Sequence, residues 1–130
     1  MNLMEQFARH LEFAGFGTYA SEEEEGDIFY GQMPDAPDTA ICVFSQDSAT
    51  PGSTSGARMQ VYTRGEVGDA KTPYETACAI ADALEGFIGF LGGDGAFVRI
   101  EVINAAQGMG LDGSGRHIYT SNYRVYYCES

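Results

Sequence analysis

The stretch from Ile28 to Phe44 reads IFYGQMPDAPDTAICVF and contains two apolar runs around a doubled Pro-Asp sequence. The runs 28–30 and 39–44 have the aromatic and β-branched character of strands. Between them, each proline fixes its own φ and lacks a backbone donor, and the residue before each proline is pushed toward an extended conformation. Residues 31–38, the Pro-Asp corner, are therefore predicted to form a wide, stiff bend and not a two-residue hairpin turn.

Apolar residues at steps of three and four predict two helices. The first helix is predicted over Leu3–Ala14, with Gly15 as its stop. The second is predicted to begin at 72–75, where Thr72 suits an N-cap, Pro73 the first helical position and Glu75 a capping box. This helix is expected to end at the glycines of 92–95. Its expected buried stripe consists of Tyr74, Ala77, Ala81, Leu84 and Ile88.

Alternation of apolar and polar residues predicts further strands at 57–64, around 97–103 and at 116–128. In the last of these, one face is expected to carry Tyr119, Tyr123, Val125 and Tyr127. Residues 107–115 are predicted to be a flexible connection between the last two strands. The order of helix, strands, helix and two strands predicts an α+β fold, in which a mostly antiparallel sheet of four to five strands carries both helices on one face.

Length and charge narrow the class of protein. The 130 residues suit a single domain over 1–130. A net charge of −12, from 19 acidic and 7 basic residues, disfavours tight binding to nucleic acid or to an anionic membrane. The N-terminus resembles no secretion signal, and no apolar run approaches the ~20 residues of a membrane span. We therefore expect a protein that is cytosolic where it is made.

Two polar segments are expected to be loops. The run Glu22–Glu25 carries four adjacent like charges and is predicted to be a solvated turn, because a hard-cation site needs spaced ligands. Residues 46–56 are rich in Ser, Thr, Gly and Pro without apolar periodicity. Loops of this length in small domains are often functional, which makes 46–56 a candidate contact arm.

No catalytic, cofactor-binding or metal-ligating residue is predicted. His10 and His117 lack partners at metal-ligand spacing, so both are interpreted as structural or surface histidines. Cys42, Cys78 and Cys128 lie in apolar or strand-like runs and are interpreted as buried thiols in a reducing compartment.

Two patterns could be mistaken for nucleotide-binding or nucleic-acid-binding sites. The glycines of 108–115 lack the lysine and hydroxyl of a phosphate-binding loop, so a hairpin tip is predicted there. The tyrosines of the last strand could stack bases, but only Arg116 and Arg124 accompany them. Packing in the core and across strands is the simpler interpretation.

Five segments in this order resemble a known family of small phage proteins. They are the first helix with Gly15-Phe16-Gly17-Thr18-Tyr19, the run 28–38, the strand 59–65, the helix around Tyr74-Glu75-Thr76-Ala77, and the ending 115–119 with 122–125. Over nearly its full length, the chain resembles bacteriophage minor capsid or tail terminator proteins of the lambda type.

This resemblance implies a structural protein without catalysis or cofactor. Members of the family form a ring, expected to be hexameric, on the last ring of the tail tube, stop its polymerisation and present the surface that joins the head. The implied partners are further copies of the chain, the tail tube protein and the head-tail connector proteins, with no membrane. DNA would pass through the lumen without specific binding, and the protein would reside in the virion after assembly in the host cytoplasm.

The stiff corner and the candidate arm are the segments where subunit contacts are expected. The expected contact residues are Pro34, Asp35, Pro37, Asp38, Thr50, Pro51 and Gly52. Two alternatives stay open from the sequence: another head-tail neck or completion protein, and a small cytosolic enzyme or ligand-binding domain that uses Cys78 or His117.

Deleting the arm of residues 46–56 is predicted to weaken ring formation while the monomer stays folded, because the arm is expected to contact neighbouring subunits. Mass measurement in solution and circular dichroism would test this prediction. Normal assembly of the deletion variant would show that the arm makes no essential contact.

Overall fold

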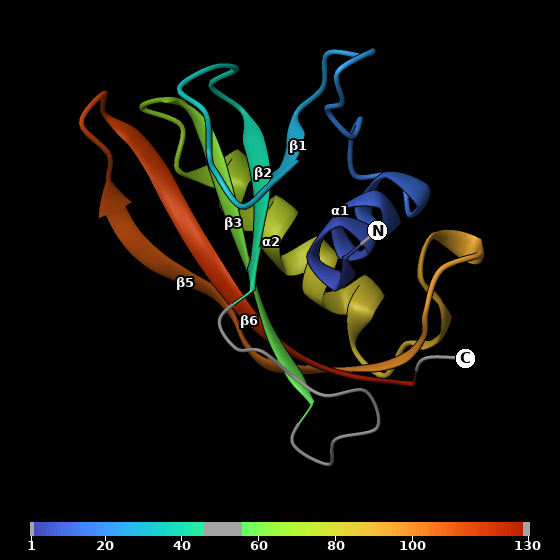
Figure 1. The fold of residues 1–130 in the computed structure, drawn as a ribbon. Coiled ribbons are helices and arrows are strands. Elements are labelled where there is room, and N and C mark those ends of the chain that lie inside the picture. Colours follow the sequence, from blue (N-terminus) through green and yellow to red (C-terminus); the bar gives the residue numbers. More distant parts are fainter. Residues whose placement is uncertain (1, 46–55, 129–130) are drawn as a thin grey trace.

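The computed structural model describes residues 2–45 and 56–128 as two helices and one six-stranded sheet (Figure 1). In chain order the elements are α1 (Leu3–Phe13), β1 (Ile28–Tyr30), β2 (Ala40–Ser45), β3 (Ala57–Val67), α2 (Lys71–Leu84), β4 (Ile88–Phe90), the 3-10 turn η1 (Leu91–Gly93), β5 (Phe97–Leu111) and β6 (Arg116–Cys128). The order of strands in the sheet is β1-β2-β3-β6-β5-β4. The predicted α+β class is confirmed, but the sheet has six strands where four to five were expected. None of the described helices is long and apolar enough to cross a membrane.

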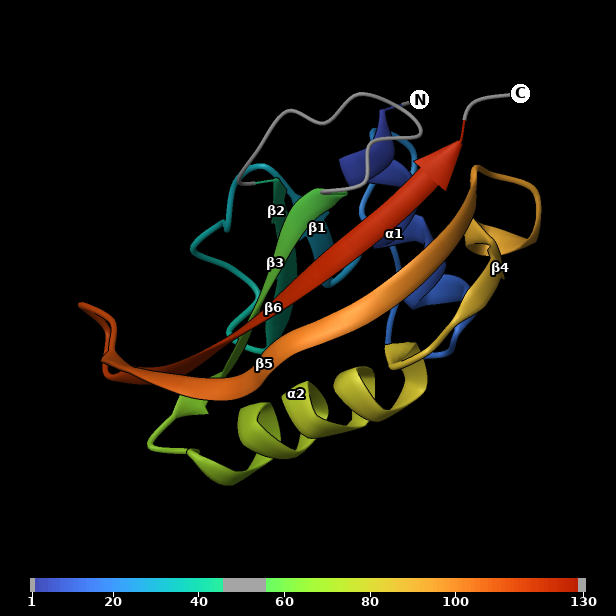
Figure 2. The ribbon, with the colours of Figure 1, turned by 90° about the horizontal axis from the view of Figure 1, so that it is seen from below.

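Both helices pack on the same face of the sheet, as predicted. Phe7 of α1 lies 5.9 Å from the ring of Tyr123, and Tyr74 of α2 lies 5.5 Å from the ring of Tyr119. Tyr119 and Tyr123 are four residues apart on β6, so they point to the same side. Figures 1 and 2 show the long strands curling around this side, where the apolar core is enclosed.

The curl of the sheet has a local cause in β5. Its pairing with β6 shifts register between Val102 and Asn104, between Asn104 and Gln107, and between Gly108 and Leu111. Each shift places an extra residue on β5, and such bulges bend a strand and increase its twist. Because the bulges keep β5 paired as far as Leu111, the prediction of a flexible connection over 107–115 is wrong for most of that segment.

β1 and β2 run parallel, in contrast to every other pair in the sheet. Ile28 is paired with Ile41, and Tyr30 with Val43. A parallel connection must carry the chain back to the start of the first strand, which usually takes a dozen or more residues. β1 has only 3 residues, so the Pro-Asp corner returns the chain over a short distance. The predicted wide bend is confirmed, and it makes the sheet mixed.

α2 begins and ends earlier than the sequence pattern predicts. Its first residue is Lys71, and the carboxylate of Asp69 accepts the N–H groups of Lys71 and Thr72, each at 3.0 Å. Asp69 therefore takes the capping role that was predicted for Thr72. Glu85 is extended and Gly86 has a φ of +72°, which ends the helix after Leu84.

The chain after Gly86 forms β4, a strand that the sequence pattern assigned to the helix. Ile88, Gly89 and Phe90 pair with Arg99, Val98 and Phe97 of β5. Ile88 is 63% exposed, so the prediction that it continues the buried stripe of α2 is wrong. Tyr74, at the other end of that predicted stripe, is also exposed, at 48%.

Two polar side chains of α1 fasten this helix to the turn that follows β4. The Nδ1 atom of buried His10 accepts the N–H of Gly92 at 2.8 Å, and Oε1 of Gln6 accepts the N–H of Ala96 at 2.7 Å. The His10 ring also lies 4.7 Å from that of Phe87. Burial lowers the pKa of His10 below its usual 6.5, which favours the neutral ring that can accept this hydrogen bond. The interpretation of His10 as a structural histidine is confirmed.

The lowered pKa of His10 predicts that the protein loses stability as the pH falls below about 6.5. Between the folded pKa and that value, the unfolded chain binds more protons than the folded chain, so the free energy of unfolding rises with pH. In a His10→Gln variant, which keeps an acceptor but cannot titrate, this pH dependence should flatten. Urea denaturation midpoints across pH 5.5 to 7.5 would measure it.

A His117→Gln variant is the matched control, because it removes the other histidine and retains His10. The urea denaturation midpoint of this variant should keep the wild-type dependence on pH. An unchanged slope in His10→Gln would contradict the assigned role of His10.

Candidate assembly surface

The Pro-Asp corner is held against the outer face of the sheet, opposite the helices, by the buried side chain of Arg64. From β3, the Arg64 Nε donates to the Asp38 carbonyl at 2.9 Å and Nη2 donates to the Pro37 carbonyl at 2.7 Å. Arg64 is only 4% exposed. Burial and the neighbouring charge of Arg116 lower the pKa of Arg64, but the guanidinium stays charged because its reference pKa is so high. Two backbone carbonyls of the corner thus receive charged donors.

Arg116, at the start of β6, binds the same corner through both terminal nitrogens of its guanidinium. Nη1 donates to the Asp35 carbonyl at 2.6 Å and to the Asp38 carboxylate at 3.0 Å, while Nη2 donates to the Asp35 carboxylate at 3.0 Å. Nε donates to the Asp112 carboxylate at 2.8 Å. Burial opposes the charge of Arg116, but its hydrogen bonds to these aspartates outweigh burial and raise the pKa of Arg116.

We call Arg64 and Arg116, together with their partners in the corner, the arginine clamp. The Arg116 side chain is 5% exposed, whereas the side chains of Asp35 and Asp38 are 93% and 52% exposed. The clamp therefore fixes the corner from beneath and leaves acidic side chains at the surface. Four of the expected contact residues, Pro34, Asp35, Pro37 and Asp38, lie together in this corner, and the other three, Thr50, Pro51 and Gly52, lie outside the described residues.

Apolar side chains are exposed around the free edge of β4. We call this group, Phe13, Ile88, Phe90 and Phe97, the edge patch, and its members are 66%, 63%, 54% and 48% exposed. The rings of Phe90 and Phe97 pack edge to face at 5.0 Å. The Phe13 ring lies near Gly93 in η1, which follows β4 directly. Apolar groups gathered in this way on a surface are a candidate site of contact with another molecule.

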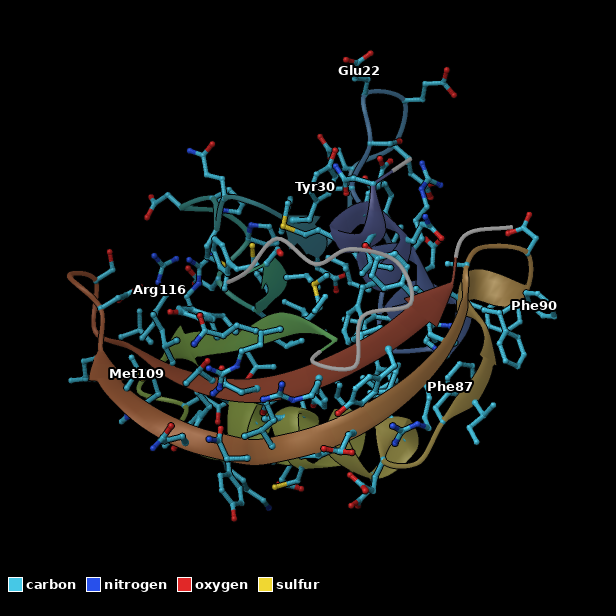
Figure 3. The ribbon with its side chains drawn as sticks, turned by 60° about the horizontal axis from the view of Figure 1, so that its bottom comes forward. Glu22, Tyr30, Phe87, Phe90, Met109 and Arg116 are labelled. Atoms are coloured by element: carbon cyan, nitrogen blue, oxygen red, sulfur yellow. The ribbon has the colours of Figure 1, made fainter. Side chains whose placement is uncertain are left out.

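Further exposed apolar side chains lie at the end of the sheet where β3 ends and the β5–β6 hairpin turns. Val67 pairs with Arg116 and Leu111 with His117, so these two side chains lie on opposite faces of the sheet. We call Val67, Met109 and Leu111 the tip patch, and they are 64%, 54% and 60% exposed. Figure 3 shows Met109 and Phe90 at opposite ends of the long β5 ribbon, with Arg116 on the same side as Met109. The clamped corner and the tip patch therefore share one end of the molecule, and the edge patch lies at the other.

The acidic run predicted as a solvated turn is exposed at Glu22–Glu25 and borders an open groove beside α1. Figure 3 shows Glu22 projecting away from the body of the protein. Within the groove, Arg9 lies over the Tyr19 ring at 4.4 Å, and the Tyr19 hydroxyl donates to Glu5 at 3.1 Å. In the described part of the chain, no group of His, Cys, Asp and Glu is arranged to hold a metal ion.

The cysteines and the second histidine are not assembled into a reactive centre in the residues that the structure describes. Burial raises the pKa of the Cys42 thiol to about 12, so this thiol is unreactive near neutral pH. Cys78 was predicted to be buried and is half-buried on α2, and His117 is half-buried on β6. The side chain of Cys128 lies outside the described residues.

The arginine clamp was not predicted from the sequence. Arg116 was considered only as a partner for base stacking, and Arg64 only as the polar end of a strand. The available signal was the scarcity of basic residues: with 7 Lys and Arg against 19 Asp and Glu, an arginine inside a strand pattern is a candidate for a buried ion pair.

The comparisons with known proteins agree with a structural role in a phage. The family model described as bacteriophage tail terminator protein matches residues 10–127, so the chain belongs to this family. A chain in the solved virion of a native gene transfer agent particle has a similar fold, with a TM-score of 0.54 and 18% identity over 76% of this chain and 77% of that chain.

A second solved chain aligns over 78% of this chain and 79% of its own length with 19% identity, but its TM-score of 0.43 is too low to support a comparison of folds. Among curated proteins, no match is found.

Replacing Arg64 with methionine is predicted to lower the free energy of unfolding by roughly 2–4 kcal/mol, because two carbonyls beneath the corner lose charged donors. Urea denaturation would measure the loss. Arg58→Met is the matched control, since Arg58 points to the same face of β3 and its buried Nε has no hydrogen-bond partner among residues 2–45 and 56–128. The control should change the free energy of unfolding by less than about 1 kcal/mol. Equal losses of this free energy in both variants would contradict the stabilising role assigned to Arg64.

Proposed function

We propose that this protein is the terminator of a phage tail, a virion component that forms a ring on the end of the tail tube and stops its growth. The observation that carries this proposal is the match to the bacteriophage tail terminator family, which covers residues 10–127 of the 130. The exposed apolar patches at two ends of the subunit support it, because a ring needs two contact surfaces on each subunit.

The proposed mechanism is steric and involves no catalysis and no cofactor. Residues 1–130 act as one domain in this role. A closed ring, hexameric as the family resemblance implies, covers the tube end and denies the next tube subunits their docking surface. The upper side of the ring then offers a surface to the head-tail connector proteins. The net charge of −12 suits a lumen through which DNA slides without sticking.

The Pro-Asp corner is proposed as one of the contact surfaces. Its backbone is fixed before assembly by Arg64 and Arg116, so binding there orders few groups and costs little conformational entropy. Asp35 and Asp38 can then meet basic groups on a neighbour. The segment with Thr50, Pro51 and Gly52 is proposed as a second contact.

Purified protein added to growing tail tubes is predicted to stop elongation when present at about one ring per tube end. Tube lengths measured by negative-stain electron microscopy would test this, with bovine serum albumin at equal mass as the control. Tubes that keep growing in excess protein would contradict the terminator function. Rings that bind connectors but not tube ends would favour a different protein of the neck.

A further inference from the structure

His10 joins α1 to residues 86–96, which we call the β4 segment. Its Nδ1 atom accepts the Gly92 N–H at 2.8 Å, and its ring lies 4.7 Å from the ring of Phe87 and 5.9 Å from that of Phe13. Phe13 in turn lies against Gly93. Figure 2 shows α1 alongside β4. The edge patch therefore includes a side chain of α1, and His10 contacts both sides of the junction that holds this patch together.

The β4 segment is only weakly attached to the sheet. β4 has 3 residues and lies at the edge of the described sheet, next to β5. Ile100 of β5 donates to the Phe87 carbonyl at 2.9 Å. Because the hydrogen-bonding positions alternate in an antiparallel pair, Ile88 and Phe90 direct their N–H and C=O groups away from β5. A short edge strand of this kind can open locally while longer strands stay paired.

Glycines near both ends of the β4 segment allow its backbone to change direction. Gly86 and Gly93 have φ values of +72° and +91°, in the left-handed region that favours glycine. Between them, Leu91 is 2% exposed and anchors the segment in the core. Closure of the segment therefore depends on the burial of Leu91 and on the two hydrogen bonds to α1, one of which is accepted by a histidine.

Only a neutral His10 can keep its hydrogen bond to Gly92. Because Nδ1 accepts, the neutral ring carries its hydrogen on Nε2, and a second proton would bind at Nδ1. The protonated ring would then direct an N–H at the N–H of Gly92, so the hydrogen bond would be lost and two donors would face each other. His10 is 5% exposed, and burial lowers its pKa because the charged ring loses its hydration. Protonation is therefore favoured once the ring has left this site.

Charged side chains around His10 do not oppose this effect. Burial is the cause that lowers its pKa among the residues that the structure describes. The acidic residues of α1 bind Arg9 or the Tyr19 N–H, Glu85 accepts an N–H of β5, the two charged residues at the start of β5 pair with each other, and Asp94 is exposed. The charged residues on the elements packed around His10 are Glu5, Arg9, Glu12, Glu85, Asp94, Arg99 and Glu101.

We propose that protonation of His10 releases the β4 segment from α1, so that this segment opens while the long strands of the sheet stay folded. His10 then acts as a pH-sensitive latch. The edge patch is a surface of the neutral state, because Phe13 on α1 and Phe90 on β4 are separated when the junction opens. The latch is a property of the single subunit and does not depend on the proposed terminator function.

The direction of the pH effect follows from the two states of the β4 segment. In the closed state the pKa of His10 lies below 6.5, whereas in the open state the ring is hydrated and titrates near this ordinary value. Between the two pKa values the open state binds more protons, so opening becomes more favourable as the pH falls, by at most about tenfold per pH unit. Well above pH 6.5 neither state is protonated, and opening no longer depends on pH.

Amide hydrogen exchange of the full chain, followed by NMR from pH 5.5 to 7.5, tests the latch. Protection factors are compared, since they remove the intrinsic effect of pH on exchange. The amides of Leu91, Gly92 and Gly95 report on the β4 segment, and those of Gly31 and Ile41 report on the opposite side of the sheet. Protection in the first group should fall by roughly three- to fivefold between pH 6.5 and 5.5, while protection in the second group stays unchanged.

Two variants assign this pH dependence to His10. In His10→Gln, which keeps an acceptor that cannot titrate, protection of the β4 segment should no longer change with pH. Gln6→Met is the matched control, because it removes the other hydrogen bond between α1 and this segment and retains His10. It should lower protection of the segment at every pH and keep the wild-type dependence on pH.

Three results would overturn the proposal. An equal fall in both groups of amides would mean that the whole protein opens, and an unchanged protection of the β4 segment would mean that no latch exists. A pH dependence that persists in His10→Gln would assign the effect to another group. Should that variant not fold, the ring signals of His10 in the wild type decide: they must titrate below pH 6.5, and titration at or above this value would contradict the latch.

Discussion

The arginine clamp is the interaction on which the outer face of this protein depends. Burying a guanidinium costs solvation free energy, and the cost is offset only where its donors are satisfied. Arg116 achieves this with carboxylates from 35, 38 and 112, while Arg64 uses two carbonyls of the corner. Because the aspartates remain partly exposed, they meet the buried charge without being fully desolvated themselves. The result is an acidic surface on a fixed backbone.

The clamp also joins parts of the chain that are distant in sequence. The Pro-Asp corner completes the parallel pairing of β1 with β2, and Arg116 ties that corner to Asp112 in the turn of the hairpin. The bulges of β5 meanwhile curve the sheet around the helices and carry the hairpin tip away from β4. The two apolar patches are thus held at opposite ends of one stiff body, which is the geometry that a repeating contact requires.

Local pattern was sufficient to predict most elements of the fold. The stripe of α1, the alternation of β3 and the buried face of β6 follow from periodicities of 3.6 and 2, and the structure has them where they were expected. The predicted first residue of α2, Pro73, lies two residues after the observed first residue, Lys71, because Asp69 and not Thr72 accepts the first N–H groups of the helix. β4 was missed because Ile-Gly-Phe is too short to show alternation and continues the spacing of the preceding helix.

The candidate contact surfaces were less predictable. The corner could be recognised as stiff from its prolines, but its partners Arg64 and Arg116 are up to 81 residues away in the chain. The patches around Phe90 and Met109 depend on where β5 bulges and which strand lies at the edge of the sheet. Neither property has a local sequence signal.

The central claim is that a preformed subunit assembles through the ends of its sheet. Amide hydrogen exchange tests this claim most directly, when free protein is compared with protein bound to tube ends. The amides of Gly31 and Ile41 flank the corner and are hydrogen-bonded to Val43 and Asp27. They should exchange slowly in the free protein already, whereas the amides of Ile88 and Phe90 should slow only on assembly. Fast exchange at Gly31 and Ile41 in the free protein, or unchanged exchange at Ile88 and Phe90 on assembly, would contradict the account.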